Sequence, residues 1–392
     1  MLINKIKFIK LAVIVLGLVY SGVAQAIPAN TSCPTGQVIQ STLTTGAKWT
    51  MCWQARAEEG IVLSNIRYQA SGQIERWVLG EMSLSQIQRN YDDGSPTQYL
   101  VTDSGLGGSN SIALTANDCV GGSLKSVAGK KVLCQNTKDA GIIYKYDAEQ
   151  AVSGKVLSLS SASQIGNHSY IQEWLFHENG IIQPRIGLSG MLDKIGSDAR
   201  YGWPIQADGT VGVGFVDNYF WRLDFELGGN DGNDVVMQIA NNLSVNRDTR
   251  AKNITAISTE SSRNFSPESK RTWVVRDSIE TNGFAPISYE LVLLNYAQQA
   301  VGQNAEPWLA KDVFFTRYKS CERFAVRNPT SNGCGADVSQ FVSGDSLNSA
   351  DVVVWNRLSY HHLPRDEDDN LIGTQWNQFK LLPRDWHRRN PL

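Results

Sequence analysis

The amino-acid sequence predicts a mainly β protein built around one large antiparallel β-sandwich. Strand-like alternation of apolar and polar residues recurs along the chain, turn dipeptides interrupt it, and helical periodicity is weak. The clearest local signal is a β-hairpin, because two strand-like runs at 170–176 and 181–186 flank the turn Asn179-Gly180. With 42% hydrophobic and 19% charged residues, the composition is that of a globular chain and excludes a disordered, collagen-like or coiled-coil protein.

The other elements follow in chain order. Further strands are predicted at 61–68, 73–79, 211–227, 287–296 and 352–358, and short helices at 83–90 and 306–312. No repeat of fixed period and no low-complexity linker divides this part of the chain. Residues 56–392 are therefore predicted to form one sandwich domain, preceded by a short segment, 27–55, that carries two cysteines.

The first 26 residues have the pattern of a secretory signal peptide. Three lysines precede an apolar run at 11–20, and Ala24-Gln25-Ala26 is a small-residue cleavage site. The run is too short for a stable membrane span, and no other stretch of about 18 apolar residues follows. We therefore expect an exported protein, periplasmic or extracellular, with no membrane span in the mature chain.

The charge balance bears on the partners of the protein. There are 36 Lys and Arg against 38 Asp and Glu, and loss of the three signal lysines lowers the net charge from −2 to −5. Proteins that bind nucleic acid present an excess of basic residues to the phosphates. The sequence therefore argues against a nucleic-acid partner.

Six cysteines lie in the predicted mature chain, and an even number in an exported protein indicates disulfides. A zinc site is the alternative, but it needs closely spaced Cys-x-x-Cys pairs, which this sequence lacks. The spacing falls into three local pairs. The predicted disulfides are Cys33–Cys52, Cys119–Cys134 and Cys321–Cys334.

Residues 163–180 carry a specific resemblance. Gly166-Asn167-His168-Ser169-Tyr170 and the following Glu173-Trp174-Leu175-Phe176 resemble the cofactor strand of copper amine oxidases, which reads Gly-Asn-Tyr-Asp/Glu-Tyr and continues into an acidic-Trp-x-Phe hairpin. Further matches occur in family order, at 59–82, 105–107, 118–119, 220–224, 316–318, 362–368 and 389–391. The resemblance implies the large sandwich of the family's catalytic domain, and a homodimer formed through it.

The family's catalytic residues do not all have counterparts in this sequence. In the family, a tyrosine becomes topaquinone, three histidines hold copper, and an aspartate acts as the base. His168 matches the tyrosine, Phe215 and Asp217 match two of the histidines, and only His362 matches a histidine. Leu100 matches the base, although a shifted alignment places Asp103 nearby. The resemblance therefore predicts a chain without topaquinone and without the usual amine oxidation.

Two classes of function follow from these replacements. The first is a non-catalytic binding or structural module, with an unknown protein or small-molecule ligand, and the sequence favours it over an enzyme. The alternative is an enzyme, either a residual amine oxidase or one with a remodelled metal site. In the remodelled site, His168, Asp217 and His362 would hold a transition metal, because two imidazoles and a carboxylate suit Fe, Zn, Mn or Cu.

A second metal position also follows from the resemblance. Asp224, Glu226 and Asp351 match positions that hold a peripheral Ca²⁺ in some family members, and carboxylates are the ligands that Ca²⁺ prefers. Plain solvated charge on an exposed strand is the alternative. Near the C-terminus, His387 lies in a basic segment with Arg384, Arg388 and Arg389, which we expect to dock on an acidic surface.

Overall fold

The computed structural model describes residues 33–230, 232–242, 250–294, 306–331, 333–369 and 371–392. The predicted signal peptide lies outside the described residues. Residues Cys33–Leu392 form one compact unit. Among the described residues, no helix is both long and apolar enough to cross a membrane.

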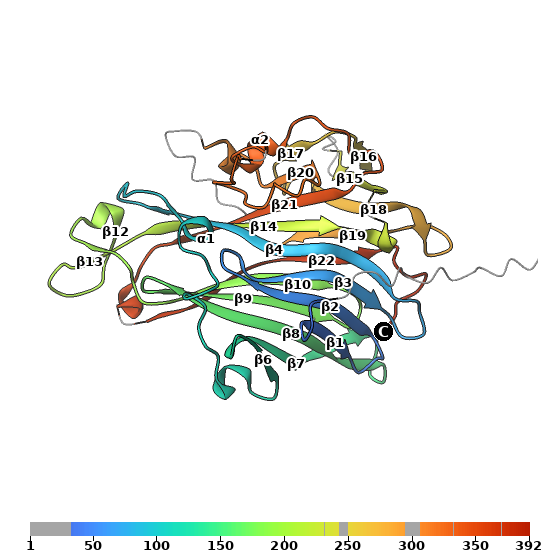
Figure 1. Cartoon of the computed structure of the whole chain (residues 1–392), viewed down its shortest axis with the longest axis horizontal. Coiled ribbons are helices and arrows are strands. Elements are labelled where there is room, and N and C mark those ends of the chain that lie inside the picture. Colours follow the sequence, from blue (N-terminus) through green and yellow to red (C-terminus); the bar gives the residue numbers. More distant parts are fainter. Residues whose placement is uncertain (1–32, 231, 243–249, 295–305, 332, 370) are drawn as a thin grey trace, which may run out of the picture. The chain divides into compact units, whose positions relative to one another are not determined.

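Two large antiparallel sheets form this unit (Figure 1). In the described residues the first sheet has nine strands. Eight follow one another in the order β1 (Val38–Thr42), β2 (Lys48–Arg56), β3 (Gly60–Gln69), β4 (Arg76–Tyr91), β14 (Phe215–Phe225), β21 (Val352–His362), β20 (Val313–Arg317) and β17 (Ser261–Arg263), and β5 (Gln98–Tyr99) pairs with β4.

The second sheet has ten described strands. Their order is β16 (Lys252–Ile257), β15 (Asp234–Asn241), β18 (Thr272–Thr281), β19 (Pro286–Leu293), β22 (Ile372–Arg384), β10 (Ile182–Gly190), β9 (His168–His177), β8 (Ala151–Ile165), β7 (Lys130–Lys145) and β6 (Ser123–Val127). A small third sheet joins β11 (Ile195–Gly196), β13 (Val211–Val213) and β12 (Gly202–Pro204).

Helices are few and short in the described residues. Two are single α-helical turns, α1 (Leu100–Asp103) and α2 (Val338–Phe341). The others are 3₁₀ turns: η1 (Ala116–Cys119), η2 (Ala199–Tyr201), η3 (Leu227–Gly229), η4 (Pro307–Leu309) and η5 (Asp366–Asp368). The mainly β sandwich that the sequence predicts is confirmed.

The core lies between the two large sheets and is rich in aromatic side chains. Trp174 on β9 and Trp221 on β14 are fully buried, and their ring centroids lie 6.2 Å apart across the interface of the sheets. The hairpin predicted around Asn179-Gly180 is formed by β9 and β10, with Phe176 opposite Ile182. Burying such large side chains is the main favourable contribution to folding.

The three disulfides that the cysteine spacing predicts are present, joining Cys33 to Cys52, Cys119 to Cys134 and Cys321 to Cys334. The first of them fastens the chain before β1 to β2. Since β2 pairs with β3, the described part of the predicted N-terminal segment adds strands to the same sheet as the residues that follow it.

The predicted helix at 83–90 is wrong, because these residues form the middle of β4. Polar residues at 85, 86, 88 and 89 break the alternation that marks a half-exposed strand, yet all four are buried. The helix predicted at 306–312 is reduced to the turn η4. The long strand predicted at 211–227 is divided at Gly214 into β13 and β14.

Candidate functional site

Four strands bring the predicted site residues together between the sheets. Arg89 on β4 lies directly opposite Asp217 on β14, and Phe215 on β14 lies opposite His362 on β21. His168 begins β9, in the second sheet. Its cross-strand partner, Gly190, has a φ of +113° and lies so close to the Asn167 carbonyl that a Cβ there would fall 2.4 Å from the oxygen. Only glycine fits opposite His168.

The centre of the site is a buried ion pair between Arg89 and Asp217. Arg89 donates from Nε to Asp217 Oδ1 and from Nη2 to Oδ2, each over 2.7 Å. The exposed fractions of the two side chains are 1% and 0%. Burial alone would lower the pKa of Arg89, but the Asp217 carboxylate together with Tyr170 and Tyr91 outweighs burial and raises this pKa well above its ordinary value. Two parallel bonds of this kind are among the strongest in proteins.

Arg89 also fixes the chemical state of His168. Its Nη1 lies 2.5 Å from His168 Nδ1. A guanidinium has only donors, so Nδ1 must be the acceptor and the proton of the neutral imidazole sits on Nε2. Burial, together with the charge of Arg89 and the nearby His362, lowers the pKa of His168 to about 2. His168 is therefore neutral throughout the physiological pH range.

Phe215 lies in the middle of these polar groups. The Arg89 guanidinium carbon is 4.0 Å from the centroid of its ring, within the range of a cation–π contact. The imidazoles of His168 and His362 pack against the same ring, with centroids 5.2 and 5.1 Å away. An apolar ring therefore separates the two histidines.

Two tyrosine hydroxyls complete the surroundings of Asp217. Tyr219 donates to Asp217 Oδ2 over 3.0 Å, and the Tyr170 hydroxyl lies 3.5 Å from the same atom. Burial and the neighbouring carboxylate raise the pKa of Tyr219 well above its ordinary value. Both oxygens of Asp217 therefore accept from donors of this chain, and the ion pair is satisfied without solvent.

His362 lies at the edge of the cluster. Its Nδ1 is 3.3 Å from the Tyr360 hydroxyl, and its Nε2 is 3.4 Å from Asp368 Oδ2. Burial lowers the pKa of His362 more than Asp368 raises it. The structure places His168, Asp217 and His362 in one region, with Arg89 and Phe215 among them.

The two residues considered for the catalytic base are placed differently. Leu100, in α1, is buried in the core and has no group that could accept a proton. Asp103, at the end of the same turn, pairs with Arg327 Nη1 over 2.7 Å and is 41% exposed. Neither residue contacts His168 through a hydrogen bond in the described structure.

The residues considered for calcium lie at the other end of β14. A Cβ at Gly80 would fall 3.1 Å from Glu226 Oε2 and 3.7 Å from the Asp224 carboxyl carbon, so both side chains approach the same point on β4. The pKa of the buried Asp234 is raised well above its ordinary value, mainly by burial and by the charge of Asp277. Asp351 and Glu226 also raise this pKa. The strand ends thus gather several carboxylates.

Arg89 is the functional residue that sequence reasoning missed. It lies in the stretch predicted as a helix, where its position relative to Asp217 could not be seen. One signal was available, since a buried Asp217 at a metal-ligand position needs a compensating cation. An arginine in a polar run of an internal strand is a source of that charge.

The chain is similar to known proteins both in sequence and in structure. The family model described as the copper amine oxidase enzyme domain matches residues 38–392. The primary amine oxidase of Arthrobacter sp. (strain P1) is 25% identical over 414 residues, which cover 93% of this chain and 62% of that protein. Primary amine oxidase 2 of Arabidopsis thaliana is 27% identical, over 81% of this chain and 53% of its own length.

Solved structures agree. A copper-containing benzylamine oxidase from Hansenula polymorpha superposes with a TM-score of 0.77 at 16% identity, covering 93% of this chain and 64% of its own. The Aspergillus nidulans amine oxidase gives 0.75 at 21% identity, over 88% and 52%. The two-sheet architecture is thus that of an amine oxidase catalytic domain. The chain belongs to the copper amine oxidase family, and it spans about 60% of the length of the first relatives it matches.

The residues at this site do not fit the copper and topaquinone that the family uses. Phe215 has no lone pair for a metal, both Asp217 oxygens are bonded to Arg89, and the imidazole at His168 cannot become a quinone. Among the described residues, no group of three or more His, Cys, Asp or Glu side chains is arranged to hold a metal ion. The two candidate metal sets, one around His168 and one around Asp224, therefore remain predictions that metal analysis can test.

Proposed function

We propose that this chain is an exported member of the copper amine oxidase family that does not oxidise amines through topaquinone and acts as a binding or structural module. One observation carries the proposal: the Arg89 guanidinium is bonded to Asp217 and His168 in the site. The predicted signal peptide and the three disulfides support a location outside the cytoplasm.

The cation–carboxylate pair supports loss of the metal for an electrostatic reason. A guanidinium carries a permanent positive charge, and a divalent cation within a few ångströms would be strongly repelled in a site shielded from water. To coordinate a metal, Asp217 would have to leave Arg89, which would strand a buried charge. His168 could offer a lone pair at Nε2 only after losing its bond from Arg89 at Nδ1.

The same argument weighs against the alternative enzyme, in which His168, Asp217 and His362 hold Fe, Zn, Mn or Cu. His362 keeps a nitrogen near Asp368, but the other two groups are engaged with Arg89. Ca²⁺ at Asp224, Glu226 and Asp351 is independent of Arg89. We propose it as a structural ion, supported by the carboxylates that gather at these strand ends.

The test is metal content and amine turnover on the mature chain purified from the periplasm. After equilibration with Cu²⁺, Zn²⁺, Fe²⁺, Mn²⁺ and Ca²⁺, mass spectrometry should find no stoichiometric transition metal in the wild type or in His168→Ala. Any bound calcium should disappear in Asp224→Asn. Methylamine, benzylamine and histamine should yield no hydrogen peroxide, while the Arthrobacter enzyme run in parallel should yield it.

One equivalent of a transition metal that is lost in His168→Ala would overturn the proposal in favour of a rebuilt metal site. Amine-dependent peroxide from the copper-loaded protein would overturn it in favour of a residual oxidase. Calcium alone, lost in Asp224→Asn, would leave the proposal intact and establish the structural ion.

A further inference from the structure

A polar pocket lies where the C-terminal segment passes the turn between β3 and β4. Its volume is about 630 Å³. One wall is formed by residues 386–391, and the other by Ser71, Gln73, Arg76 and Asn282. The pocket shares no residue with the cluster around Arg89.

The C-terminal segment is held in place beside this pocket. Trp386 is 2% exposed and packs against Tyr289, with ring centroids 5.0 Å apart. The next residue, His387, packs its ring against Tyr68 at 5.8 Å, and its carbonyl accepts from Asn282 Nδ2 over 3.4 Å. These contacts fix the backbone just before Arg388 and Arg389. The two arginines therefore have a defined position in the wall of the pocket.

The charges of the pocket are unbalanced. Arg76, Arg388 and Arg389 line it, and no Asp or Glu is among its described lining residues. None of the three arginines forms an ion pair within the described structure, whereas Arg384, just outside, pairs with Glu290 over 2.5 Å. Burial lowers the pKa of Arg76, and the charge of Glu280 raises it by less.

The expected docking of the basic segment on acidic residues holds for Arg384, which pairs with Glu290. Arg388 and Arg389 form no ion pair among the described residues and line the pocket together with Arg76. The Arg76 Nε–H is buried and has no hydrogen-bond partner in the described structure. An uncompensated group of guanidinium ions is unfavourable, and an anion in the pocket would relieve the repulsion among them.

We propose that this pocket binds an oxyanion of the phosphate type, free or carried on a small organic molecule. Guanidinium groups bond phosphate oxygens in pairs, and three of them match an anion with two charges better than a single carboxylate. Ser71, Gln73 and Asn282 add neutral polar groups to the walls. The volume exceeds that of a bare phosphate and leaves room for an attached organic body.

The first experiment is isothermal titration of the full mature chain with inorganic phosphate at fixed ionic strength. We expect saturable binding of one equivalent. The double variant Arg388→Gln/Arg389→Gln should weaken it about tenfold or more, because each charged hydrogen bond lost contributes about that factor. Arg200→Gln/Arg327→Gln removes the same charge from exposed arginines paired with Asp198 and Asp103 and should leave binding unchanged.

A second variant and a second ligand complete the test. Arg76→Gln, checked for an unchanged melting temperature, should weaken phosphate binding to a similar extent. Tighter binding of glycerol 3-phosphate than of phosphate would identify a phosphorylated organic ligand, and equal binding would identify the free anion. Absence of saturable binding, or equal weakening by the control variant, would overturn the proposal, whatever the outcome of the amine and metal assays.

Discussion

Arg89 compensates the negative charge of Asp217 in the middle of the sandwich, where neither side chain is exposed to water. Replacing Arg89 by Met keeps an unbranched apolar stem but removes the guanidinium, which leaves a buried carboxylate without its cation. Breaking a buried pair in this way typically costs about 3–5 kcal/mol. We expect Arg89→Met to lower the free energy of unfolding by that amount, measured by urea denaturation.

Two further variants separate charge from packing. Arg200→Met breaks an exposed pair with Asp198 and should cost less than about 1 kcal/mol. Adding Asp217→Leu to Arg89→Met removes the stranded charge and should recover part of the loss. An Arg89→Met protein as stable as the wild type would show that Asp217 does not depend on Arg89.

Glu322 gives a prediction on pH dependence. Its side chain is 4% exposed, and burial raises its pKa to about 7, although Lys319 acts in the opposite direction. Between about pH 4.5 and 7 the folded protein therefore keeps a proton that the unfolded chain has lost. Stability linked to Glu322 is present below that window and is lost as the pH rises through it.

Glu322→Gln removes this titration and should flatten that part of the stability profile. The buried histidines change stability in the opposite direction over the same window, because their pKa values are lowered. The quantity to measure is therefore the difference in melting temperature between wild type and Glu322→Gln. This difference should favour the variant increasingly from pH 5 to pH 8; a constant difference would contradict the assignment.

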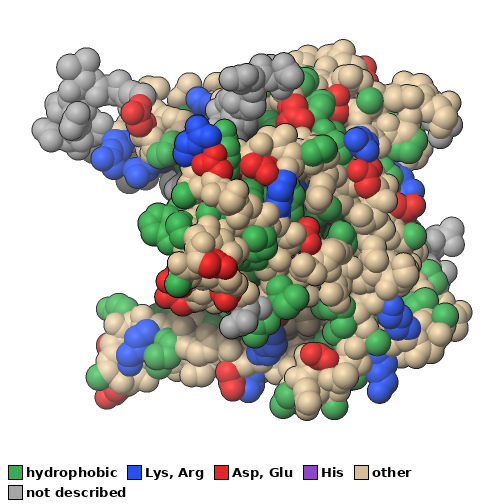
Figure 2. All heavy atoms as spheres, turned by 90° about the vertical axis from the view of Figure 1, so that its left-hand side faces the viewer, with side chains coloured by type: hydrophobic (Ala, Val, Ile, Leu, Met, Phe, Trp, Pro, Cys, Tyr) green, Lys and Arg blue, Asp and Glu red, His purple; other side chains and the backbone are tan. Residues whose placement is uncertain are grey.

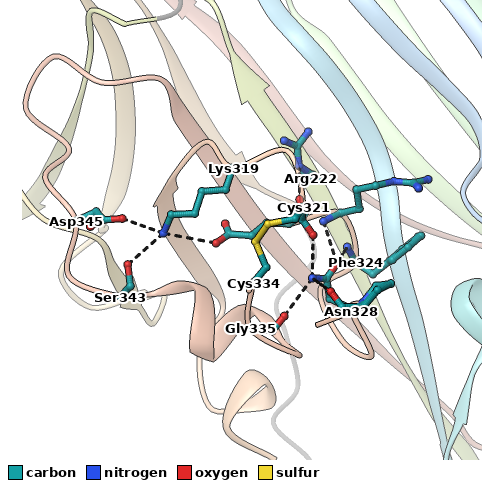
Figure 3. Close-up of a disulfide and its surroundings, with 12 residues drawn as sticks. Arg222, Lys319, Cys321, Phe324, Asn328, Cys334, Gly335, Ser343 and Asp345 are labelled. Carbon is teal, nitrogen blue, oxygen red and sulfur yellow. Dashed lines mark hydrogen bonds and ion pairs between the residues drawn. A yellow bond between two sulfur atoms is a disulfide. The ribbon is translucent and has the colours of Figure 1, made fainter. Parts of the chain in front are cut away.

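Among the elements, the described residues between β20 and α2 have almost no regular structure, yet they are held by several contacts (Figure 3). The disulfide Cys321–Cys334 joins the two ends of a loop in this segment, and the Asn328 side chain bonds to both ends from within the loop. Asn328 Nδ2 donates to the carbonyls of Cys321 and Gly335, over 2.9 and 3.1 Å, and Oδ1 accepts from the amide of Arg323. One side chain thus supplies the hydrogen bonds that a strand partner would otherwise provide.

We expect Asn328→Ala to lower the free energy of unfolding by about 2 kcal/mol or more, because several buried backbone groups lose their partner. Chemical denaturation under oxidising conditions measures this with the disulfide intact. Asn253→Ala, on the exposed strand β16, is the matched control and should change stability by less than about 0.5 kcal/mol. Equal effects of the two variants would show that Asn328 does not organise the loop.

Element type was predictable where strands alternate or meet a tight turn, as in the β9–β10 hairpin. It was not predictable in β4, because Gln86, Gln88 and Arg89 are buried polar residues whose partners lie far away in sequence. Gln86 donates to the carbonyl of Val326, and Arg89 pairs with Asp217. Such pairings decide burial, and no local pattern encodes them.

For the whole molecule, the family resemblance implies a homodimer, and one end of the sandwich has features that suit an interface. Figure 2 shows the end where β12 and β13 project, with hydrophobic side chains among charged ones of both signs. Six exposed apolar residues lie on or beside the small third sheet and its neighbouring loop: Met191, Ile195, Tyr201, Trp203, Leu363 and Leu371. Exposed apolar groups of this kind often mark a contact between proteins.

We therefore expect the mature chain to be a dimer of about twice its own mass by light scattering. Trp203→Ser, at a 51% exposed position, should shift it toward the monomer without lowering the melting temperature of the dilute protein. Ile254→Ser, on the exposed strand β16, is the control and should leave the mass unchanged. A wild type that is monomeric at high concentration would contradict the prediction.

The sequence located the region of the candidate site, because the motif around His168 and the position of His362 follow the family order. It could not give the chemistry of that region. The decisive contact joins Arg89 to Asp217, which are 128 positions apart, and only the pairing of β4 with β14 brings them together. Likewise, the sequence showed that the C-terminal residues are basic, but it could not show that Arg76 lines the same pocket.

The guanidinium in the sandwich has a consequence for how the protein matures. A metalloprotein exists in empty and loaded forms, and its finished state depends on supply of the ion from outside. Here the positive charge is part of the polypeptide, so chelators cannot remove it and dilution cannot exchange it. We expect this site to be complete as soon as the chain has folded, in cells starved of copper as well as in cells that have plenty.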